Sequence, residues 1–455
     1  MIGGNPPVPR TPTCGDAVRA MKIGIVGTGH VGLVTGVAFA SLGHRVVATD
    51  VDRNKIRFLN AGKAPFREPG LDELLESTIA EDRIRFVESL RDAVTDADVV
   101  FVCVGRPTVG NGDRSVGAVE EAVRSIARAA TPGSVVVVKS TVPPGTTDRA
   151  ARVIHAERPD LDVDVVSSPE FLREGHALDD TLAPDRLVIG STSPRATQRI
   201  LDLYANMLTN GAQPFVTDPA TAELSKLASN AFLALKISYA NAVARIGELV
   251  GADARDVSRI MGADPRIGDA FLGAGLGFGG YCLPKDVMTL ERQASKLGYD
   301  FGLLREVTRV NDEALEAVRG MIEEAVWNLE GKRIALFGLA FKDGVDDVRG
   351  SRALALAESL MSGDAHVVGY DPVAAETAAE MLPSLTIAAD PYEAAEGASC
   401  IVVCEGASVF SALDLERLRS VVASPVVVDG RNTLDGATIS AAGFLYLPVG
   451  APPLG

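Results

Sequence analysis

The sequence lacks long apolar runs, an excess of positive charge and paired cysteines, and each absence excludes a class of function. No apolar run reaches the ~18 residues of a membrane-spanning helix, so we expect no membrane partner. Lys and Arg total 44 against 60 Asp and Glu, a net charge of −16, which argues against nucleic acid or an anionic membrane surface, since both need a basic face. The 5 cysteines are scattered without metal-ligand or disulfide spacing, so we expect no metal site and a reducing, cytoplasmic location.

Residues 1–20 also lack the apolar core of a signal peptide. They are rich in proline and glycine, which predicts a disordered leader with Met21 as a candidate start. The chain has 455 residues, too many for a single ordinary core, so we expect about three units. An anionic small molecule is compatible with the acidic chain, because a few placed cations and helix N-termini suffice to bind it.

The segment after this leader carries a dinucleotide-binding fingerprint. The apolar run Lys22–Val26 predicts a strand, and Gly27-Thr-Gly29-His-Val-Gly32 follows it directly. A helical pattern then runs from Val31 to Leu42, and a second strand is predicted at Arg45–Thr49, ending at Asp50. Strand, G-x-G-x-x-G, helix and an acid about 20 residues further on is the order that binds a dinucleotide.

Each residue of this fingerprint has a physical reason. Gly27 makes the turn, Gly29 lets a pyrophosphate approach the helix N-terminus, and Gly32 lets helix and strand pack closely. A carboxylate at Asp50 accepts both ribose hydroxyls and repels a 2′-phosphate, so the pattern favours NAD over NADP. Asp52 is a rival for the ribose contact, although it lies past the end of the strand.

Further strands are predicted at 98–104, 134–139, 162–166 and 186–190, and we expect the last of these to close the first sheet. Their alternation with helical segments predicts a parallel sheet buried on both faces. A helix is then predicted from Thr221 to Val250, with Asp218 or Thr221 as its N-cap. Its length suits a connection between two lobes. Glu223, Lys226 and Asn230 share one of its faces, either as site residues or as a solvated charged stripe.

The chain restarts as a second α/β unit after residue 330. Strands are predicted at 332–338, 366–371, 400–404 and 425–429, with a helix at 351–361. This unit has no G-x-G-x-x-G, so we expect it to bind something other than a whole dinucleotide. The predicted fold class is α/β, with two Rossmann-like doubly wound parallel sheets joined by a long central helix and a helical middle domain. The predicted boundaries are a leader at 1–20, then domains at 21–217, 218–325 and 326–455.

A glycine-rich stretch from Gly273 to Asp286 precedes this second unit. Its glycines permit close backbone approach to a ligand or positive φ. The stretch ends with Cys282, Lys285 and Asp286. A thiol beside a cation and a carboxylate suits a nucleophile, whereas the alternative is a surface loop with an inert cysteine. The other cysteines in apolar runs, Cys103, Cys400 and Cys404, are expected to belong to the core.

Six motifs in this order resemble the UDP-glucose/GDP-mannose dehydrogenase family, over residues 21 to about 435. They are Gly27–Gly32, Lys139-Ser-Thr-Val-Pro-Pro-Gly-Thr146, Pro169-Glu-Phe-Leu-Arg-Glu-Gly175, Glu223-Leu-Ser-Lys-Leu-Ala-Ser-Asn230, Gly277-Phe-Gly-Gly-Tyr-Cys-Leu-Pro-Lys-Asp286 and Phe341-Lys-Asp-Gly-Val-Asp-Asp-Val-Arg349. The resemblance is strongest to the branch that acts on UDP-glucose. It implies oxidation of the sugar's primary alcohol to a carboxylate with two NAD⁺, through a thiohemiacetal and a thioester on Cys282.

The resemblance also implies roles for individual residues. Lys226 and Asn230 stabilise an oxyanion, Asp286 and Thr141 activate or position water, and Glu170 assists proton transfer. Cofactor contacts are implied for Gly27, Gly29, His30, Val31, Gly32, Asp50, Lys55, Pro107, Thr108, Thr141, Glu174, Lys285 and Arg349. Substrate contacts are implied for Phe171, Leu172, Lys226, Asn230, Arg266, Phe278, Gly279, Lys342 and Arg431, with Arg266 reaching across the interface of a homodimer.

Five positions depart from the family pattern. His30 replaces an aromatic residue, Arg106 a threonine, Ser168 an asparagine, Tyr281 a small residue and Arg352 a proline. None of these changes removes a residue assigned to chemistry. For His30, a solvent-facing or helix-capping role is favoured over catalysis.

Several readings other than oxidation of UDP-glucose remain open. The same chemistry could act on GDP-mannose or on a UDP-N-acetyl sugar. A non-catalytic sensor of NAD or nucleotide sugar needs no thiol, and a two-electron β-hydroxyacid dehydrogenase needs neither Cys282 nor a second Rossmann-like unit. The retention of Cys282, Lys226, Asn230 and Asp286 together favours the enzyme.

Overall fold

The chain forms two compact units whose boundary lies inside one long helix. The computed structural model describes residues 19–105, 116–405, 410 and 412–455. The first unit ends at Ala228 and the second begins at Ser229, both within helix α10 (Pro219–Val250). Each described unit contains a parallel-dominated sheet with its own hydrophobic core, so the predicted α/β fold class is confirmed.

The described part of the first unit holds an eight-stranded sheet in the order β3-β2-β1-β4-β5-β6-β7-β8. Neighbouring strands pair in parallel except β6 and β7, which meet in antiparallel fashion at Ser167 and Gly190. The first six positions follow the 3-2-1-4-5-6 order of a dinucleotide-binding sheet, with the switch point between β1 and β4. The strands are β1 (Lys22–Val26), β2 (Arg45–Thr49), β3 (Ile84–Val87), β4 (Val99–Val102), β5 (Val135–Val138), β6 (Asp164–Ser167), β7 (Arg186–Gly190) and β8 (Gln213–Thr217).

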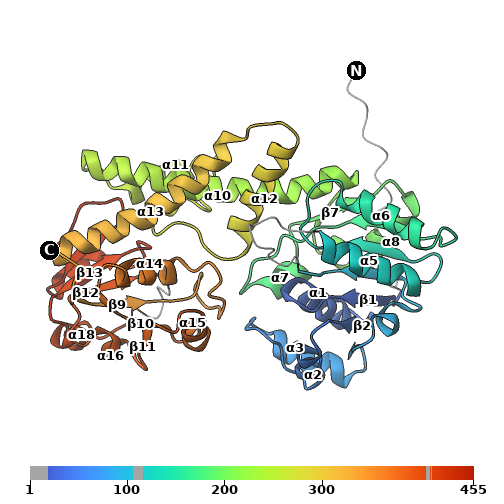
Figure 1. Ribbon diagram of the computed structural model, residues 1–455, viewed down its shortest axis with the longest axis horizontal. Helices are drawn as coiled ribbons and strands as arrows, with labels where there is room; N and C mark the ends of the chain where they lie inside the picture. The colour runs from blue at the N-terminus through green and yellow to red at the C-terminus, as the bar shows by residue number, and fades with distance from the viewer. Residues whose placement is uncertain (1–18, 106–115, 406–409, 411) are drawn as a thin grey trace. The chain divides into compact units, whose positions relative to one another are not determined.

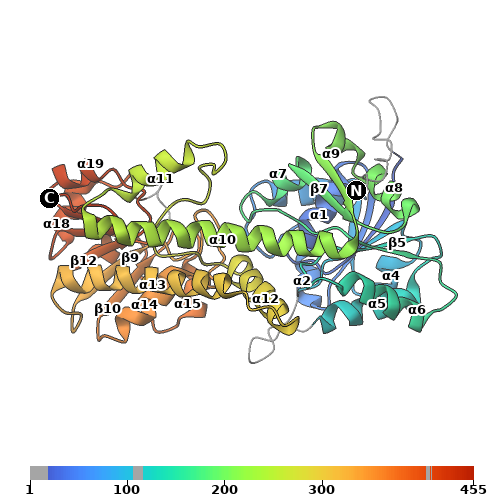
Figure 2. The same cartoon turned by 90° about the horizontal axis from the view of Figure 1, so that it is seen from above.

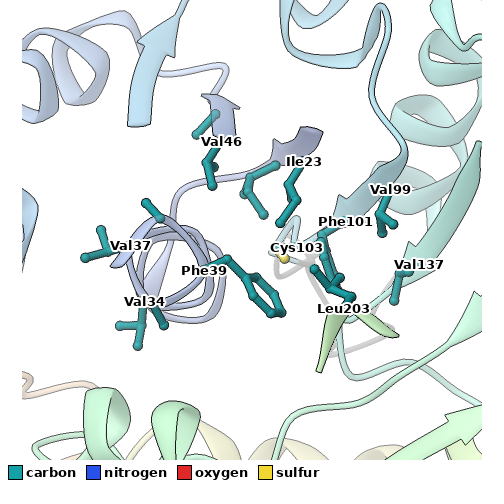
Figure 3. Close-up of a cluster of buried hydrophobic side chains, with 14 of the residues drawn as sticks. Ile23, Val34, Val37, Phe39, Val46, Val99, Phe101, Cys103, Val137 and Leu203 are labelled. Atoms are coloured by element: carbon teal, nitrogen blue, oxygen red, sulfur yellow. The ribbon is translucent and has the colours of Figure 1, made fainter. Parts of the chain in front are cut away.

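Helices surround this sheet because its central strands are apolar on both faces. All four residues of β4 and all four of β5 are buried, as in a sheet covered on two sides. Figure 3 shows Phe39 of α1 packed beside Phe101 and Cys103 at the end of β4. The helices are α1 (His30–Ser41), α2 (Arg53–Asn60), α3 (Leu71–Ala80), α4 (Leu90–Val94), α5 (Gly117–Ala129), α6 (Thr146–Glu157), α7 (Ala177–Leu182), α8 (Pro194–Leu203) and α9 (Ala205–Thr209).

The second unit joins a helical layer to a six-stranded, all-parallel sheet in the order β11-β10-β9-β12-β13-β14. This repeats the 3-2-1-4-5-6 order of the first sheet, which confirms the second Rossmann-like unit. Its strands appear in orange and red in Figure 1. They are β9 (Arg333–Phe337), β10 (His366–Tyr370), β11 (Thr386–Ile387), β12 (Cys400–Val403), β13 (Val426–Asp429) and β14 (Leu445–Pro448).

The helices of the second unit include the larger part of α10, and this helix runs beside α13 (Gly302–Val326) in Figure 2. A buried hydrogen bond from Ser238 Oγ to the Val307 carbonyl oxygen joins these two helices at 2.7 Å. The further helices are α11 (Ala254–Gly262), α12 (Cys282–Lys296), α14 (Arg352–Met361), α15 (Ala375–Met381), α16 (Pro391–Ala395), α18 (Leu415–Val421) and α19 (Gly436–Ala441). No helix within the described ranges is long and apolar enough to cross a membrane.

Two sequence predictions were wrong in detail. The first sheet does not close at β7, because β8 (Gln213–Thr217) pairs with it in parallel. The strand was missed because it contains a proline and exposed positions, as an edge strand can. The glycine-rich stretch is not a loop to its end. Cys282, Lys285 and Asp286 lie in the first turns of α12, where Pro284 is tolerated because the first helical amides have no partner within the helix.

The sequence left Asp218 and Thr221 as alternative N-cap residues of α10, and the structure shows which of them caps the helix. Asp218 accepts a hydrogen bond from the Thr221 amide at 2.9 Å, so Asp218 is the cap. The helix begins at Pro219, a residue that suits a first helical turn.

Candidate active site

The turn between β1 and α1 has the shape that a dinucleotide phosphate needs. Gly27 has a φ of 97°, and a Cβ at Gly32 would lie 1.9 Å from the Gly27 carbonyl oxygen, so only glycine fits there. A Cβ at Gly29, by contrast, would meet nothing within 4 Å. Gly29 is the N-cap of α1 and supplies no side-chain cap, so the helix N-terminus has room for an anion. These residues fit NAD.

Asp50 stands at the end of β2 beside this turn. Its carboxylate accepts hydrogen bonds from the Thr28 amide at 2.8 Å and the Asp52 amide at 3.0 Å, and Lys55 Nζ lies 3.2 Å away. Burial raises the pKa of Asp50, but these amides and the Lys55 charge lower it overall, so the carboxylate is ionised. The rival Asp52 caps α2 instead, by accepting from the Asn54 amide at 2.9 Å.

His30, the first residue of α1, faces inward rather than toward solvent. Its ring stacks on Phe66 with a centroid distance of 3.8 Å, and its Nε2 lies 3.2 Å from Glu68 Oε2. Glu68 also accepts hydrogen bonds from the Gly175 amide at 2.8 Å and the Ala177 amide at 2.7 Å. Neither of the roles favoured for His30, solvent-facing or helix-capping, describes this contact. Val31, the next residue, packs against the core of the first unit.

The motif after β6 meets the N-terminal part of α10. Lys226 Nζ lies 3.4 Å from Glu170 Oε1, and both side chains are at most 10% exposed. The other oxygen of Glu170 accepts a hydrogen bond from the Leu172 amide at 2.8 Å. Lys226 Nζ lies 5.2 Å from the centre of the Phe171 ring, and the Arg186 guanidinium lies 3.9 Å from it. The structure therefore brings four predicted residues, Glu170, Phe171, Leu172 and Lys226, into one cluster.

Glu223 shares a helix face with Lys226 but has a structural role. Its carboxylate is buried and accepts hydrogen bonds from the Gly145 amide, the Thr147 amide and Thr147 Oγ1 at 2.6 to 2.7 Å. It therefore fastens α10 to the start of α6, where the helix dipole favours an anion. Burial raises the pKa of Glu223 above its usual value.

Further predicted residues of the first unit lie after its strands β5 and β6. Thr141 follows β5 and is partly buried, and Glu174 is partly buried two residues after Leu172. Pro107 and Thr108, together with the unusual Arg106, lie outside the described residues.

The second unit presents Cys282 at the first position of α12. The thiol-bearing residue is exposed, and a helix N-terminus favours the thiolate. One turn later, Asp286 is fully buried, accepts a hydrogen bond from Asn230 Nδ2 at 2.7 Å and lies 3.1 Å from Lys285 Nζ. Because Cys282 and Asp286 are four residues apart, they share one helix face.

Tyr281, which precedes this cysteine, is flanked by two cations. The Arg349 guanidinium lies 4.8 Å and Lys285 Nζ 5.4 Å from the centre of its ring. Arg349 also pairs with Asp347 through both ends of its guanidinium group. Two predicted cofactor contacts, Lys285 and Arg349, therefore share one aromatic neighbour, although they come from segments far apart in the sequence.

The predicted substrate residues Phe278 and Gly279 lie in the glycine-rich stretch, against other segments of the second unit. A Cβ at Gly279 would lie 2.4 Å from the Gly350 carbonyl oxygen, so the close approach is to the protein's own backbone. Arg431 Nη1 donates to the Gly277 carbonyl oxygen at 3.2 Å, and its Nε lies 2.9 Å from Glu405.

Lys342 and Arg266 have different surroundings. Lys342 is partly buried and follows Phe341, whose ring would meet a Cβ at Gly280 at 2.6 Å. Arg266 is not brought to these residues. Its side chain is 88% exposed and pairs with Asp264, two residues earlier.

The other described cysteines are unsuited to nucleophilic chemistry. Cys103, Cys400 and Cys404 are buried, as predicted, and burial raises the pKa of Cys103 and of Cys400 to about 12. At that pKa almost no thiolate forms near neutral pH. In the part of the chain that the structure describes, no group of three or more His, Cys, Asp and Glu side chains is placed to hold a metal ion.

Sequence reasoning missed several polar residues that support these clusters. Glu68 links His30 to the 175–177 backbone, and Asn311 of α13 bonds the backbone of Phe278 through both its amide atoms. Asn241 of α10 accepts from the Gly275 amide at 2.8 Å. A buried asparagine within an apolar helix stripe was the available signal for Asn241 and Asn311, because such a side chain needs a hydrogen-bond partner.

Comparison with known proteins gives a consistent result. Models of three domains described under "UDP-glucose/GDP-mannose dehydrogenase family" match the chain: the NAD binding domain at residues 21–208, the central domain at 220–313 and the UDP binding domain at 335–436.

Relatives match over nearly the whole chain. A UDP-glucose 6-dehydrogenase of Rhizobium meliloti is 43% identical over 95% of this chain and 100% of its own length. One of Pseudomonas aeruginosa is 38% identical over 96% of this chain and 98% of its own. The solved structure of a UDP-glucose dehydrogenase from Pyrobaculum islandicum is 37% identical, with a TM-score of 0.89 over 97% of this chain and 100% of that one. A UDP-D-ManNAc dehydrogenase from Pyrococcus horikoshii is 28% identical, with a TM-score of 0.84 over 94% of this chain and 99% of that one.

Proposed function

This chain belongs to the UDP-glucose/GDP-mannose dehydrogenase family of NAD-dependent enzymes, and we propose that it oxidises UDP-glucose to UDP-glucuronate in a four-electron reaction. The observation that carries the proposal is Cys282, exposed at the start of α12, one turn before the buried Asn230–Asp286–Lys285 cluster. A protein that only bound NAD or a nucleotide sugar would need no such thiol.

The thiol explains how one site completes two oxidations. The primary alcohol first loses a hydride and a proton and becomes an aldehyde. The Cys282 thiolate then adds to the aldehyde carbon, which forms a C–S bond and a tetrahedral thiohemiacetal. Loss of a second hydride and proton gives a thioester. Water attacks the thioester carbon, the C–S bond breaks, and the products are the carboxylate and the regenerated thiol. NAD⁺, when bound, accepts a hydride at each oxidation.

Charged and polar residues serve these steps. Lys226 and Asn230, one turn apart on α10, stabilise the developing oxyanion. Asp286 orients Asn230 through their 2.7 Å hydrogen bond and, with Thr141, positions or activates water. Glu170, 3.4 Å from Lys226, assists proton transfer and stabilises the ammonium group.

The cofactor is held by the turn after β1 and the end of β2. Gly27, Gly29 and Gly32 let the pyrophosphate reach the N-terminus of α1, and Asp50 accepts the ribose hydroxyls. The further cofactor contacts we propose are His30, Val31, Lys55, Pro107, Thr108, Thr141, Glu174, Lys285 and Arg349.

The nucleotide sugar is held by backbone, aromatic and cationic groups. The cations Lys342 and Arg431 suit a diphosphate, which reconciles an acidic chain with an anionic substrate. The other substrate contacts we propose are Phe171, Leu172, Lys226, Asn230, Arg266, Phe278 and Gly279.

We further propose a homodimer. Large apolar side chains stay exposed along α10, including Phe232 at 60%, Tyr239 at 55% and Ile246 at 60%. They are spaced seven residues apart and so share one helix face, as in a helix that pairs with another. The exposed Arg266 is available to such a partner. The buried free thiols of Cys103, Cys400 and Cys404 suit a reducing compartment, so we propose the cytoplasm as the location.

The test is NADH formation by the purified protein with UDP-glucose, GDP-mannose and UDP-N-acetylglucosamine, beside a Cys282→Ala variant. We expect the unaltered protein to form 2 NADH per UDP-glucose. The Cys282→Ala variant should not complete this two-step oxidation. Cys103→Ala, at a buried thiol, is the matched control and should keep the stoichiometry. Turnover with only another sugar would contradict the substrate. Full turnover by Cys282→Ala would contradict the covalent mechanism.

A further inference from the structure

The backbone of the glycine loop, which we define as residues 273–280, is fastened by side chains at consecutive residues. The Leu276 carbonyl oxygen accepts from Arg352 Nε at 3.0 Å, and the Gly277 carbonyl oxygen accepts from Arg431 Nη1 at 3.2 Å. The Phe278 amide and carbonyl both bond to the Asn311 side chain, at 2.6 and 3.1 Å. The loop is therefore held by its surroundings rather than by its own secondary structure.

Among these side chains, Arg352 is the one that contacts both the glycine loop and helix α13. Besides Leu276, its guanidinium donates from Nη2 to the carbonyl oxygen of Asn311 at 2.8 Å. The same Asn311 holds Phe278, so Arg352 connects the loop to α13 at the residue that fixes the next part of the loop. The stem of Arg352 also packs under the loop, since a Cβ at Gly279 would lie 3.3 Å from Arg352 Cγ.

The guanidinium is largely withdrawn from solvent, with a side-chain exposure of 13%. Its nearest carboxylate oxygen, on the exposed Asp312, is 3.5 Å away, so its main partners are backbone carbonyls. Burial lowers the pKa of Arg352, yet a guanidinium stays charged in proteins. Because its one printed ion pair is long and lies with an exposed carboxylate, the buried charge depends mainly on its hydrogen bonds to the two backbone carbonyls. The guanidinium therefore acts mainly by holding the backbone of the loop, and only weakly through its ion pair at the surface.

The side chain of Arg352 is not needed to start helix α14. Ser351 caps α14 and Arg352 is the first helical residue, where proline is well tolerated. Ser351 has φ −58° and ψ 127°, a conformation that a following proline accepts. A proline at this position would thus preserve the helix start but supply no side-chain donor to the loop.

We propose that Arg352 is a positioning residue that fixes the glycine loop for nucleotide-sugar binding. The proposal rests on the proposed function for the identity of the substrate. The fastening of the loop itself can be measured without any substrate.

The test compares Arg352→Pro, Arg352→Met and Arg352→Lys with the full-length unaltered chain. We expect KM for UDP-glucose to rise on the order of tenfold in the proline and methionine variants, because two charge-assisted hydrogen bonds are lost. KM for NAD⁺ should stay within about twofold, and the lysine variant should recover part of the affinity because it keeps the charge and a donor. Arg309→Met, at an exposed arginine of α13, is the matched control.

A second measurement keeps the proposal independent of activity. Amide hydrogen exchange without ligands should quicken more at residues 276–280 than in the rest of the second unit in Arg352→Pro. Unchanged exchange and unchanged KM would overturn the proposal, as would an equal rise in KM for both substrates. If the unaltered chain did not oxidise UDP-glucose, the proposed function would fail, but faster exchange in the loop would still support the role of Arg352.

Discussion

Asp50 and Asp371 each follow the second strand of a Rossmann-like sheet, but their carboxylates have different surroundings. Asp371 is buried and accepts from four backbone amides, those of Leu339, Ala340, Val373 and Ala374, at 2.7 to 3.1 Å. Asp50 is less buried and has an ammonium group nearby. Asp50 also has four polar partners in the protein, so it is the partial exposure of its carboxylate that lets it meet a ligand as well.

The first prediction at this scale concerns the choice between NAD and NADP. Asp50→Asn removes the charge that repels a 2′-phosphate and weakens the ribose contact. We expect KM for NAD⁺ to rise about tenfold, corresponding to roughly 1.4 kcal/mol, and the preference for NAD⁺ over NADP⁺ to narrow. Steady-state kinetics with both dinucleotides measures this. Asp52→Asn is the control, because asparagine still caps α2. Equal effects from the two variants would contradict the assignment of the ribose contact to Asp50.

A second prediction concerns the buried Glu68. Burial raises its pKa, but the contact with His30 and the amides of Gly175 and Ala177 lower it overall. An acid with a lowered pKa in the folded state stabilises the protein above its unfolded pKa of about 4.3, and this stabilisation is lost as pH falls through the folded value.

We therefore expect Glu68→Gln to lower the free energy of unfolding at pH 7 by about 1–3 kcal/mol, and this difference to shrink toward about pH 3. Urea unfolding at the two pH values gives the numbers. Glu81→Gln, at an exposed carboxylate paired with Arg83, should change little at either pH. A difference that grows on acidification would mean that Glu68 does not contribute as an anion.

At the scale of single elements, α10 combines three roles along its length. Near its start, Glu223 fastens it to α6; in its second turn and beyond, Lys226 and Asn230 carry the proposed chemistry; further along, exposed apolar residues form one face. A helix of 32 residues is about 48 Å long, since each residue adds 1.5 Å, and can carry several roles in series.

The exposed apolar face of α10 leads to a prediction about assembly. Ile246→Glu places a charge on this face and should shift the protein from dimer to monomer at micromolar concentration. Sedimentation velocity over a range of concentrations measures the shift. The control is Met381→Glu at the end of α15, an equally exposed apolar residue away from this face. A monomeric unaltered chain, or a dimer that Ile246→Glu leaves intact, would refute the proposed interface.

On the scale of the whole molecule, the candidate residues divide between the two units. The dinucleotide turn, Asp50 and the Glu170–Lys226 pair belong to the first, and the glycine loop, Cys282, Asp286 and Arg349 to the second. The chain between Lys226 and Asn230 is a single turn of α10, and the unit boundary falls within it. We therefore expect NAD⁺ to bind mainly to the first unit and the UDP group of the substrate mainly to the second.

This division predicts distinct patterns of amide hydrogen exchange. NAD⁺ alone should slow exchange at residues 27–32 and 50–55, and UDP alone should slow it at residues 273–281 and 341–350. Pyrophosphate, at the same concentration, controls for non-specific binding of anions. Protection by UDP confined to the first unit would contradict its assignment to the second.

The sequence by itself determined the features that depend on near neighbours. The strand at Lys22–Val26, the three glycines after it and the acid at Asp50 lie within 30 residues. Their local pattern is therefore sufficient to predict a dinucleotide-binding fold. The central strands of both sheets could also be predicted from the sequence, because a strand that is buried on both faces is a continuous apolar run. The edge strands β3, β8, β11 and β14 were not, since an edge tolerates polar residues and proline.

Only the tertiary structure decided which polar groups meet. Glu68 bonds to the Gly175 amide across 107 residues of sequence, Asn230 to Asp286 across 56, and Arg352 to Leu276 across 76. No local pattern specifies such pairs, because a buried polar group requires some partner but its sequence does not say which one. The packing of the sheets and helices brings these residues together, and thereby turns Arg352 from an unexplained departure into a proposed support of the glycine loop.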